Sequence, residues 1–203
     1  MASQTLLELR TSVKAWSNRS DISDTLIDDF INVGMARAIR KLRLPIMESS
    51  STITLETDGS ALIPRDYLEA IDLRVTVSGV TYTLERKDIS QVQEWRSLTG
   101  APKYFARRGT SFILAPEDSS VTQVQLYYYI TFQPLVEDTD TNWFITDAPE
   151  MLLYGALAEL ALYVRDEIAA STWEAKFQNS LESIQDLADG AQWSGSTLSI
   201  SRT

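Results

Sequence analysis

The chain of 203 residues contains no cysteine and no histidine. Without cysteine it has no disulfide, no thiolate nucleophile and no cysteine-bound zinc. Without histidine it has no Ser-His-Asp triad and no histidine-bound zinc. Any catalysis would have to use carboxylate, hydroxyl, amine or guanidinium groups. We therefore predict a protein that is not an enzyme and that holds no metal and no organic cofactor.

Long apolar runs are lacking as well. The most apolar stretch, residues 151–164, is broken by Glu159 and is shorter than the roughly 20 residues that a helix needs to cross a bilayer. The opening residues MASQTLLELR have neither the basic start nor the apolar centre of a signal peptide. We expect a protein that is made inside a cell and does not bind membranes.

Basic residues are relatively few: the chain has 18 of them and 28 acidic residues, which gives a net charge of -10. General affinity for nucleic acid requires clustered lysine and arginine. The composition therefore argues against a nucleic-acid-binding protein.

Capping signals predict the first helices. Thr5 and Glu8 have the spacing of a capping box, and an apolar stripe from Leu6 to Trp16 follows. Ser23 is placed to cap a second helix, which Pro45 ends.

Residues 51–146 have the short alternating stretches of β-strands. Asp58-Gly59 and Arg108-Gly109 suit hairpin turns, and Asp88 precedes a short helix. The clearest strand, residues 121–132, turns Tyr127 and Tyr129 to the face opposite Tyr128. These two tyrosines suit a sugar or base platform, a protein interface or cross-strand packing.

Helical signals return after the strands. Asp147, Pro149 and Glu150 predict the start of a buried helix that ends near Val164, and Ser171 with Glu174 predicts a cap for a last helix. The predicted fold is α+β: a helical bundle of residues 1–50 and 147–189, an inserted small antiparallel β-sandwich or barrel of residues 51–146, and an extended C-terminal arm of residues 190–203.

The candidate metal-binding and catalytic motifs in the sequence are incomplete. Asp138, Asp140 and Asn142 match the opening of a calcium-binding loop, but Trp143 and Pro149 stand where that loop needs glycine and glutamate. An acidic turn is the better interpretation. Adjacent carboxylates such as Asp28-Asp29 diverge on a helix and suit a solvated face.

Two features remain as candidate contact surfaces. One is a basic patch near the end of the second helix, which suits either phosphate or acidic partner groups or simple stabilisation of a helix C-terminus; it consists of Arg37, Arg40, Lys41 and Arg43. The other is the Ser/Gly-rich end, whose large apolar residues are Trp193, Leu198 and Ile200. It is either a frayed terminus or an arm that adds to a partner as a strand.

The order of several stretches resembles the head-to-tail adaptor, or connector, proteins of tailed bacteriophages, which are related to tail tubular protein A. The matching stretches are TLLELR, TLIDDFINVGMARAIRKLRLP, ALIPRDYLEAIDLRV, GAPKYFARRGTSFILAP, LYYYITFQPLVEDTDTNWFITDAPEMLLYGALAELALYVRDE and TWEAKF.

This resemblance implies a structural virion protein at the capsid–tail junction, made in the host bacterial cytoplasm. It implies a homo-oligomeric ring, usually of twelve copies, that binds the portal protein, continues the DNA channel and docks the next tail component, a nozzle or tail-completion protein. DNA would pass without specific binding. From the net charge we add the hypothesis that acidic side chains of the β and last-helix segments line or flank the channel.

The resemblance also implies roles for parts of this chain. Residues 190–203 become a portal-docking arm anchored by Trp193, Leu198 and Ile200. Loops near Arg107 and Arg108, and near Asp138 and Asp140, become candidate contacts to the tail side or to a neighbouring subunit.

Two alternatives from other classes stand beside this hypothesis. A wall-degrading hydrolase would require two carboxyl groups about 5–9.5 Å apart in a cleft. A carbohydrate- or protein-binding module would require an exposed aromatic platform on the β region.

Overall fold

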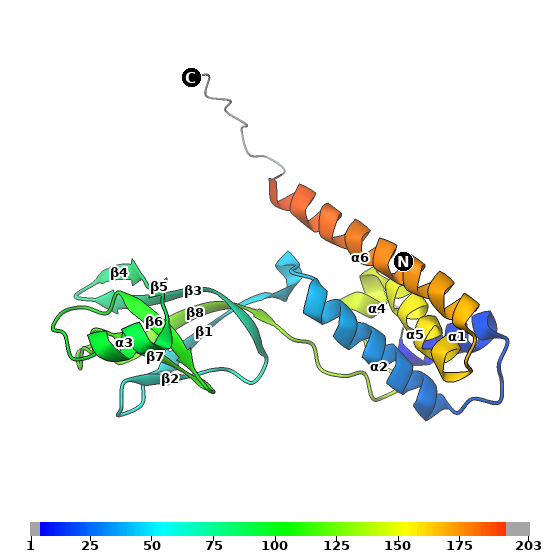
Figure 1. Ribbon diagram of the computed structural model, residues 1–203, viewed down its shortest axis with the longest axis horizontal. Helices are drawn as coiled ribbons and strands as arrows, with labels where there is room; N and C mark the ends of the chain where they lie inside the picture. The colour runs from blue at the N-terminus through cyan, green and yellow to red at the C-terminus, as the bar shows by residue number, and fades with distance from the viewer. Residues whose placement is uncertain (1–4, 194–203) are drawn as a thin grey trace, which may run out of the picture. The chain divides into compact units, whose positions relative to one another are not determined.

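A computed structural model describes residues 5–193 of the chain, with side chains up to Gly190. It confirms the predicted α+β class. The chain divides into two compact units, Met1–Ile46 with Phe132–Thr203, and Met47–Thr131 (Figure 1). Residues 132–146 were expected with the strands, and the structure places them in the helical unit.

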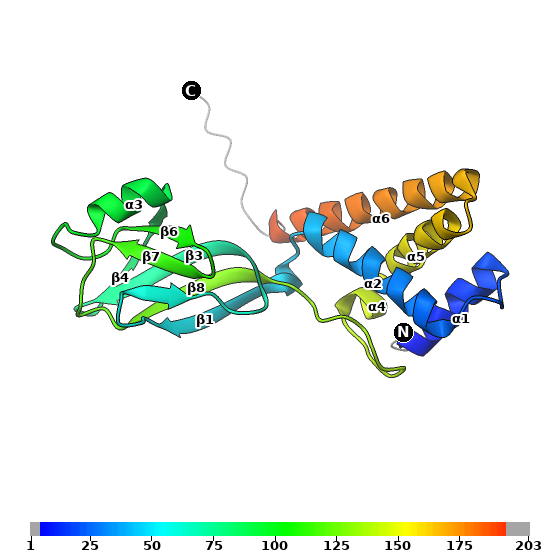
Figure 2. The same ribbon diagram turned by 60° about the horizontal axis from the view of Figure 1, so that its bottom comes forward.

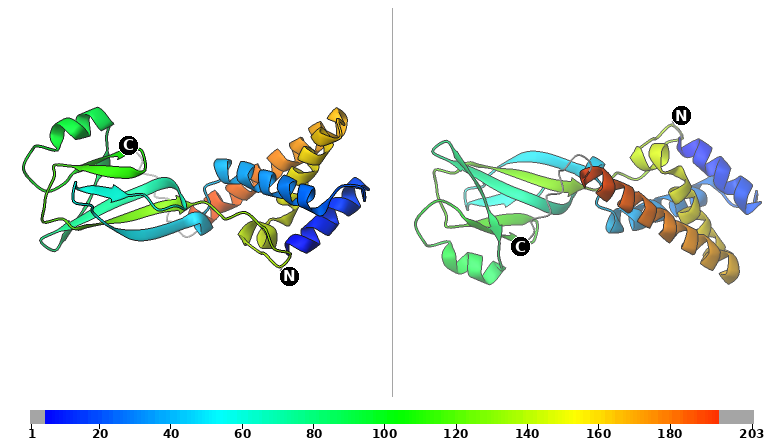
Figure 3. Two further views of the ribbon diagram at one scale, coloured as in Figure 1. Left: turned by 90° about the horizontal axis from the view of Figure 1, so that it is seen from below. Right: turned by 90° about the horizontal axis from the view of Figure 1, so that it is seen from above.

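The helical unit is built around one apolar helix. Its helices are α1 (Leu6–Ser17), α2 (Asp24–Lys41), α4 (Trp143–Asp147), α5 (Pro149–Tyr163) and α6 (Glu167–Trp193). Helix α5 packs against both α2 and α6, as the views of Figure 3 show. Nine of its fifteen residues are buried, which confirms the prediction of a central buried helix.

Two glycines allow the backbones of α2 and α5 to approach closely. A Cβ atom added at Gly155 would lie 3.2 Å from the Cα of Gly34 and 3.1 Å from the ring of Phe177 on α6. Such distances are shorter than normal carbon–carbon contacts. A residue larger than glycine at position 155 would therefore require the Phe177 ring or the backbone of α2 to shift.

Cap predictions succeed early in the chain and fail later. The Thr5–Glu8 capping box and the Ser23 cap are both present. Asp147 is instead the last residue of α4, and α5 starts after Ala148 without a side-chain cap. Ser171 lies inside α6, and the cap is supplied instead by Asp166, whose carboxylate accepts the N–H of Ala169 in the first turn of the helix.

The β unit is a sandwich of two four-stranded sheets (Figure 2). One sheet has the order β1-β8-β3-β4, with β1 (Glu48–Thr54), β8 (Gln123–Ile130), β3 (Tyr67–Val77) and β4 (Val80–Thr83). The other has the order β2-β7-β6-β5, with β2 (Ser60–Leu62), β7 (Ser111–Ala115), β6 (Tyr104–Arg108) and β5 (Glu85–Arg86). All pairs are antiparallel except the short β5–β6 pair.

The β unit has two hydrophobic layers, one between the two sheets and one beneath helix α3 (Ile89–Trp95), and successive side chains of β6 and β7 point alternately into one or the other. Val124, Leu126 and Tyr128 of β8 point into the core between the sheets, where Phe105 and Phe112 meet them from the other side. Helix α3, capped by Asp88 as predicted, covers the outer side of β6 and β7. The outer face of the β1-β8-β3-β4 sheet carries the polar residues.

The C-terminal end differs from the predicted extended arm over its first residues. Helix α6 continues through Trp193, so residues 190–193 are helical. Leu198 and Ile200 lie outside the described residues. Within residues 5–193, no helix is both long and apolar enough to cross a membrane.

Candidate interaction surfaces

Arg37, one of the four residues of the basic patch, links α2 to two other helices of the helical unit. Arg37 donates from Nη1 to Oε1 of Glu159 on α5 at 2.8 Å, and from Nη2 to both oxygens of Glu174 on α6 at 2.5 and 2.6 Å. Its guanidinium also lies 4.7 Å from the centre of the Phe177 ring. Burial acts to lower the pKa of Arg37, but these two carboxylates outweigh it and raise the pKa. The charge of Arg37 is thus neutralised within the unit.

The other three members also make internal contacts. Lys41 donates to the side-chain amide oxygen of Gln178 on α6 at 2.5 Å. Arg43 bonds to the carbonyl oxygens of Ile39 and Leu42. Arg40 is exposed and bonds only to a carbonyl of its own helix, that of Ala36, among the contacts described. Arg37 and Lys41 therefore link α2 to neighbouring helices, and Arg40 and Arg43 bond to carbonyls near the end of α2. These internal contacts weaken the interpretation of the patch as a phosphate site.

The acidic loop after β8 is fastened to α1 and α2. The backbone carbonyls of Asp138 and Asp140 accept the N–H groups of Leu7 and Leu6, which lie in the first turn of α1. Arg10 binds the carboxylate of Asp138 at 2.9 Å.

Side chains complete the fastening of this loop. The Asp140 carboxylate accepts the N–H groups of Val136 and Glu137, which lowers its pKa. The side-chain amide of Asn32 on α2 makes two 2.8 Å bonds to the backbone of Leu135. These carboxylates therefore fix the loop, so they are poor candidates for contacts to a partner.

The β6–β7 hairpin presents two arginines at the surface of the β unit. Arg107 donates to the carbonyl of Gly109 at 2.9 Å and lies 5.5 Å from the centre of the Tyr67 ring. Arg108 pairs with Asp58 at 2.9 Å. Bonds from the hydroxyl and N–H of Ser60, together with Arg108, lower the pKa of Asp58 to about 2.

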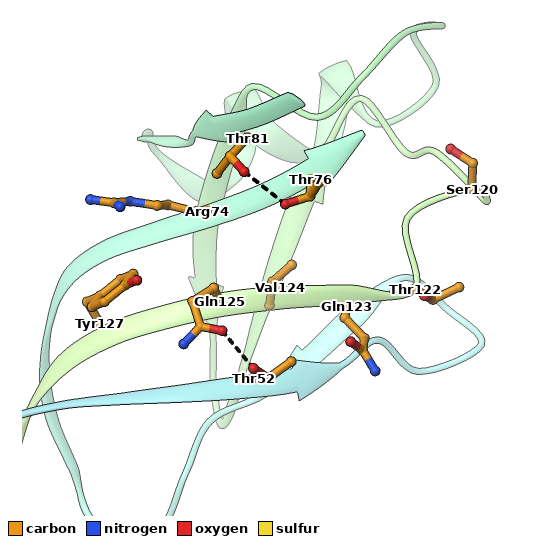
Figure 4. A pocket seen from close by; sticks show the side chains of 10 residues that line it. All are labelled: Thr52, Arg74, Thr76, Thr81, Ser120, Thr122, Gln123, Val124, Gln125 and Tyr127. Atoms are coloured by element: carbon orange, nitrogen blue, oxygen red, sulfur yellow. Dashed lines mark hydrogen bonds between the residues drawn. The ribbon is translucent and has the colours of Figure 1, made fainter. Parts of the chain in front are cut away.

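The outer face of the β1-β8-β3-β4 sheet forms a shallow polar hollow (Figure 4). Hydroxyl and amide groups join neighbouring strands across it, Thr76 to Thr81 at 3.1 Å and Thr52 to Gln125 at 2.6 Å. The guanidinium of Arg74 lies 4.7 Å from the centre of the Tyr127 ring. One face of this ring is therefore already occupied, which weakens the interpretation of Tyr127 as a sugar or base platform.

Exposed apolar residues gather near the turn between α5 and α6. Leu162 is 58% exposed, Tyr163 is 60% exposed and Ile168 is 82% exposed. A groove beside them is lined by apolar Ala158 and Ala170 and by the Arg37–Glu159–Glu174 ion pairs. Exposed apolar groups with a polar rim are typical of surfaces that bind other proteins.

A cluster of aromatic residues from α1, α5 and α6 forms another surface, which the sequence pattern did not indicate. The sequence predicts Trp16 in the apolar stripe of the first helix, but its side chain is 54% exposed. The centre of its ring lies 5.8 Å from the centre of the Trp173 ring on α6. Tyr154 stacks on Trp173 at 5.9 Å, and the Lys176 ammonium lies 4.5 Å from the centre of the Trp173 ring. Helical spacing alone could not separate this surface cluster from the core, because aromatic residues occur in both.

No metal site emerges from the described side chains, since no three acidic groups among them are arranged to hold an ion. None of the curated proteins compared matches the chain. The model of the family described as SU10 adaptor protein matches residues 4–200, and thus both units. The resemblance to phage head-to-tail adaptors is thereby confirmed. This chain belongs to the SU10 adaptor protein family and has the general role of a phage adaptor.

Proposed function

We propose that copies of this chain form a ring beneath the portal protein, continue the DNA channel and dock the next component of the tail. The observation that carries the proposal is the family match over residues 4–200, which includes the helical unit, the β unit and most of the Ser/Gly-rich end. A structural role of this kind uses surfaces and needs no catalytic residue.

The helical unit is the part that we assign to the portal. Its exposed apolar residues at the α5–α6 turn, Leu162, Tyr163 and Ile168, would be covered in such a contact. Trp193, Leu198 and Ile200 are the proposed anchors of the docking arm that follows α6. One such arm binds weakly, but repetition around a ring multiplies the strength of attachment.

The β unit is the part that we assign to the tail side. The β6–β7 hairpin with Arg107 and Arg108 is the preferred contact there. Asp138 and Asp140 are less suitable, because both take part in fastening their loop to α1 and α2.

Net charge supports passage of DNA without retention. Each copy carries -10, and a ring multiplies this charge around a common axis. Acidic side chains near the channel would repel the phosphate backbone and keep DNA from binding the wall. A channel wall that proved basic would contradict this part of the proposal.

The test is to mix the purified chain with portal rings and to image the particles by electron microscopy. We expect added ring density on one side of the portal, and its absence would contradict the proposal. A chain that lacks residues 194–203 and also carries Trp193→Ala has lost all three proposed anchors and tests the arm separately. It should fold normally but bind portal much more weakly, whereas unchanged binding would remove the arm from the proposal.

A further inference from the structure

β1 and β4 are the two outermost strands of the β1-β8-β3-β4 sheet, and each has one edge without a neighbouring strand in this sheet. Among the described backbone contacts, β1 pairs only with β8 over Glu48–Thr54, and β4 pairs only with β3. The other sheet is joined to this one at both margins. Leu55 bridges to Ala61 on one side, and the chain passes from β4 through Leu84 into β5 on the other. The free hydrogen-bonding groups of the first sheet therefore lie along β1 and β4.

Register shows which groups of β1 point outward. The N–H of Leu55 donates to the carbonyl of Thr122 on the β8 side. Pairing from Glu48 to Thr54 is regular, and bonded residues alternate in an antiparallel ladder. Ile53 and Ser51 therefore bond to β8, while Thr52 and Ser50 direct their N–H and C=O groups to the free edge.

The same reasoning applies to β4. The N–H of Leu84 donates to the carbonyl of Leu73, and the pairing from Val80 to Thr83 is regular. Tyr82 and Val80 therefore bond to β3. Thr81 and Thr83 direct their N–H and C=O groups away from the sheet.

Neither edge carries the usual protection against pairing. Natural sheets shield their edges with proline, lysine, inward-pointing charges or bulges. Apart from Glu48 at the start of β1, the strands β1 and β4 contain no proline and no charged residue, and their pairing has no bulge. On β4, Val80 is 52% exposed and Tyr82 is 44% exposed. Such edges are suited to a further strand.

Strand direction makes the two edges complementary to each other. Every neighbouring pair in this sheet is antiparallel, and the sheet has four strands, so β1 and β4 run in opposite directions. A second copy placed beside the first, with its strands in the same orientation, would bring its β1 antiparallel to β4. The alternation would then continue unbroken from copy to copy.

We propose that neighbouring copies of this chain join through their β1 and β4 edges, so that Thr81 and Thr83 of one copy bond to Ser50 and Thr52 of the next. This contact uses a different surface on each side, and contacts of that type close into rings when the rotation is suitable. The cross-strand hydroxyl and amide pairs on the outer face (Figure 4), such as Thr76 with Thr81, would gain a further pair at each junction. The inference rests on the proposed ring and names the surface that builds it.

Cysteine cross-linking offers a direct test, because the chain has no cysteine of its own. One preparation carries Thr81→Cys and the other carries Thr52→Cys with a tag that changes its mass. Within one copy these positions lie three strand spacings apart, about 14 Å, and a disulfide requires Cα atoms within about 7 Å. Only a contact between copies brings them together.

The two preparations are mixed, assembled on portal rings, oxidised and analysed on a non-reducing gel. We expect a covalent dimer that contains one chain of each mass and that is absent when either preparation is oxidised alone. A third preparation carries Ser50→Cys in place of Thr52→Cys. It detects the contact if the two strands pair with a shift of two residues. Thr76→Cys in place of Thr81→Cys is the matched control, because Thr76 lies on β3 inside the sheet and should give no dimer.

Imaging of the same samples separates the two proposals. Ring density on the portal with no mixed dimer from either pair would overturn the edge contact and leave the adaptor ring standing. Dimers formed by a single preparation would also overturn it, because they require like edges to meet. Absence of ring density on the portal would overturn both proposals.

Discussion

The two units use their charged residues differently. In the helical unit, Arg10 of α1 pairs with Asp28 of α2 and with Asp138 of the loop after β8, and Arg37 joins α2 to α5 and α6. In the β unit, Arg74 pairs with Asp72 and Lys87 pairs with Glu85, each two residues away on the surface. Most of the ion pairs described in the first unit thus join separate elements, Arg19–Asp21 being a local one. In the second unit the Arg74 and Lys87 pairs are local, while the other two described pairs, Arg108–Asp58 and Arg96–Glu117, join different segments.

The difference follows from how each unit excludes water. Two sheets enclose a continuous apolar layer between them, so strand charges can remain at the surface. Helices meet along narrow stripes, and residues at the margins of those stripes are half-buried. A half-buried charge there needs a partner, and the partner lies on the neighbouring helix.

The largest effect is expected from the core of the β unit. Phe112 is 1% exposed and makes edge contacts with Phe105 and Tyr67. Phe112→Ala should lower the free energy of unfolding of this unit by about 3–5 kcal/mol, because it removes the ring and leaves a cavity. Hydrogen exchange of β6–β8 peptides at increasing denaturant concentration measures the change.

The matched control for this substitution is Leu62→Ala on the neighbouring strand β2, where the side chain is 56% exposed. It should change stability by no more than about 0.5 kcal/mol. Equal losses for both variants would show that packing between the sheets is not what holds the β unit.

Sequence reasoning succeeded where the signal was local. The Thr5, Ser23 and Asp88 caps each depend on residues within three positions, and all three are present. Asp147 failed because Asn142 starts α4 first, bonding the N–H of Ile145, so Asp147 is already helical. Ser171 failed because Asp166 starts α6 five residues earlier.

Distant contacts decided the rest. The sequence predicts residues 132–146 as part of the β domain because they follow a clear strand. Two hydrogen bonds between Asn32 and Leu135, 103 residues apart, instead hold this segment in the helical unit. The basic residues of α2 were visible as a patch, yet nothing near Arg37 in sequence indicates Glu159 or Glu174. Partners supplied by tertiary folding cannot be deduced from composition or periodicity.

A smaller effect is expected from the ion pairs that define the comparison. Arg10 is buried and donates two 2.8 Å bonds to Asp28, whose side chain is 18% exposed. Arg10→Leu should cost about 3 kcal/mol, because the carboxylate of Asp28 is left without its cation in a partly buried position. Denaturant unfolding followed by helical circular dichroism measures the loss.

The corresponding substitution in the β unit is Arg74→Leu. Arg74 is 44% exposed and pairs with a carboxylate on its own strand, so the loss should stay below about 1 kcal/mol. The comparison between the units would fail if Arg74→Leu proved as costly as Arg10→Leu.

The smallest expected effect is the acid dependence of the α2–α5–α6 contact. Burial acts to raise the pKa of Glu174, but hydrogen bonds from Arg37 and Gln178 outweigh it and lower the pKa below its ordinary value of 4.5. The unfolded chain therefore binds a proton at Glu174 more readily than the folded chain. This contribution to stability is fully present above pH 4.5 and is lost as the pH falls through the lowered value. Because the Glu174 side chain is 39% exposed, the contribution should not exceed about 1 kcal/mol.

Glu174→Gln separates this group from the other carboxylates that titrate in acid. The variant should be slightly less stable than the unaltered chain at pH 7 and should approach it as the pH falls through the lowered pKa of Glu174, because the unaltered chain then loses the same charge. Glu182→Gln on the exposed side of α6, where the described residues supply no ion pair, should follow the unaltered chain at every pH. Parallel curves for Glu174→Gln and the unaltered chain would mean that Arg37 is held by Glu159 alone, and that the charge of α6 does not contribute to holding the helices together.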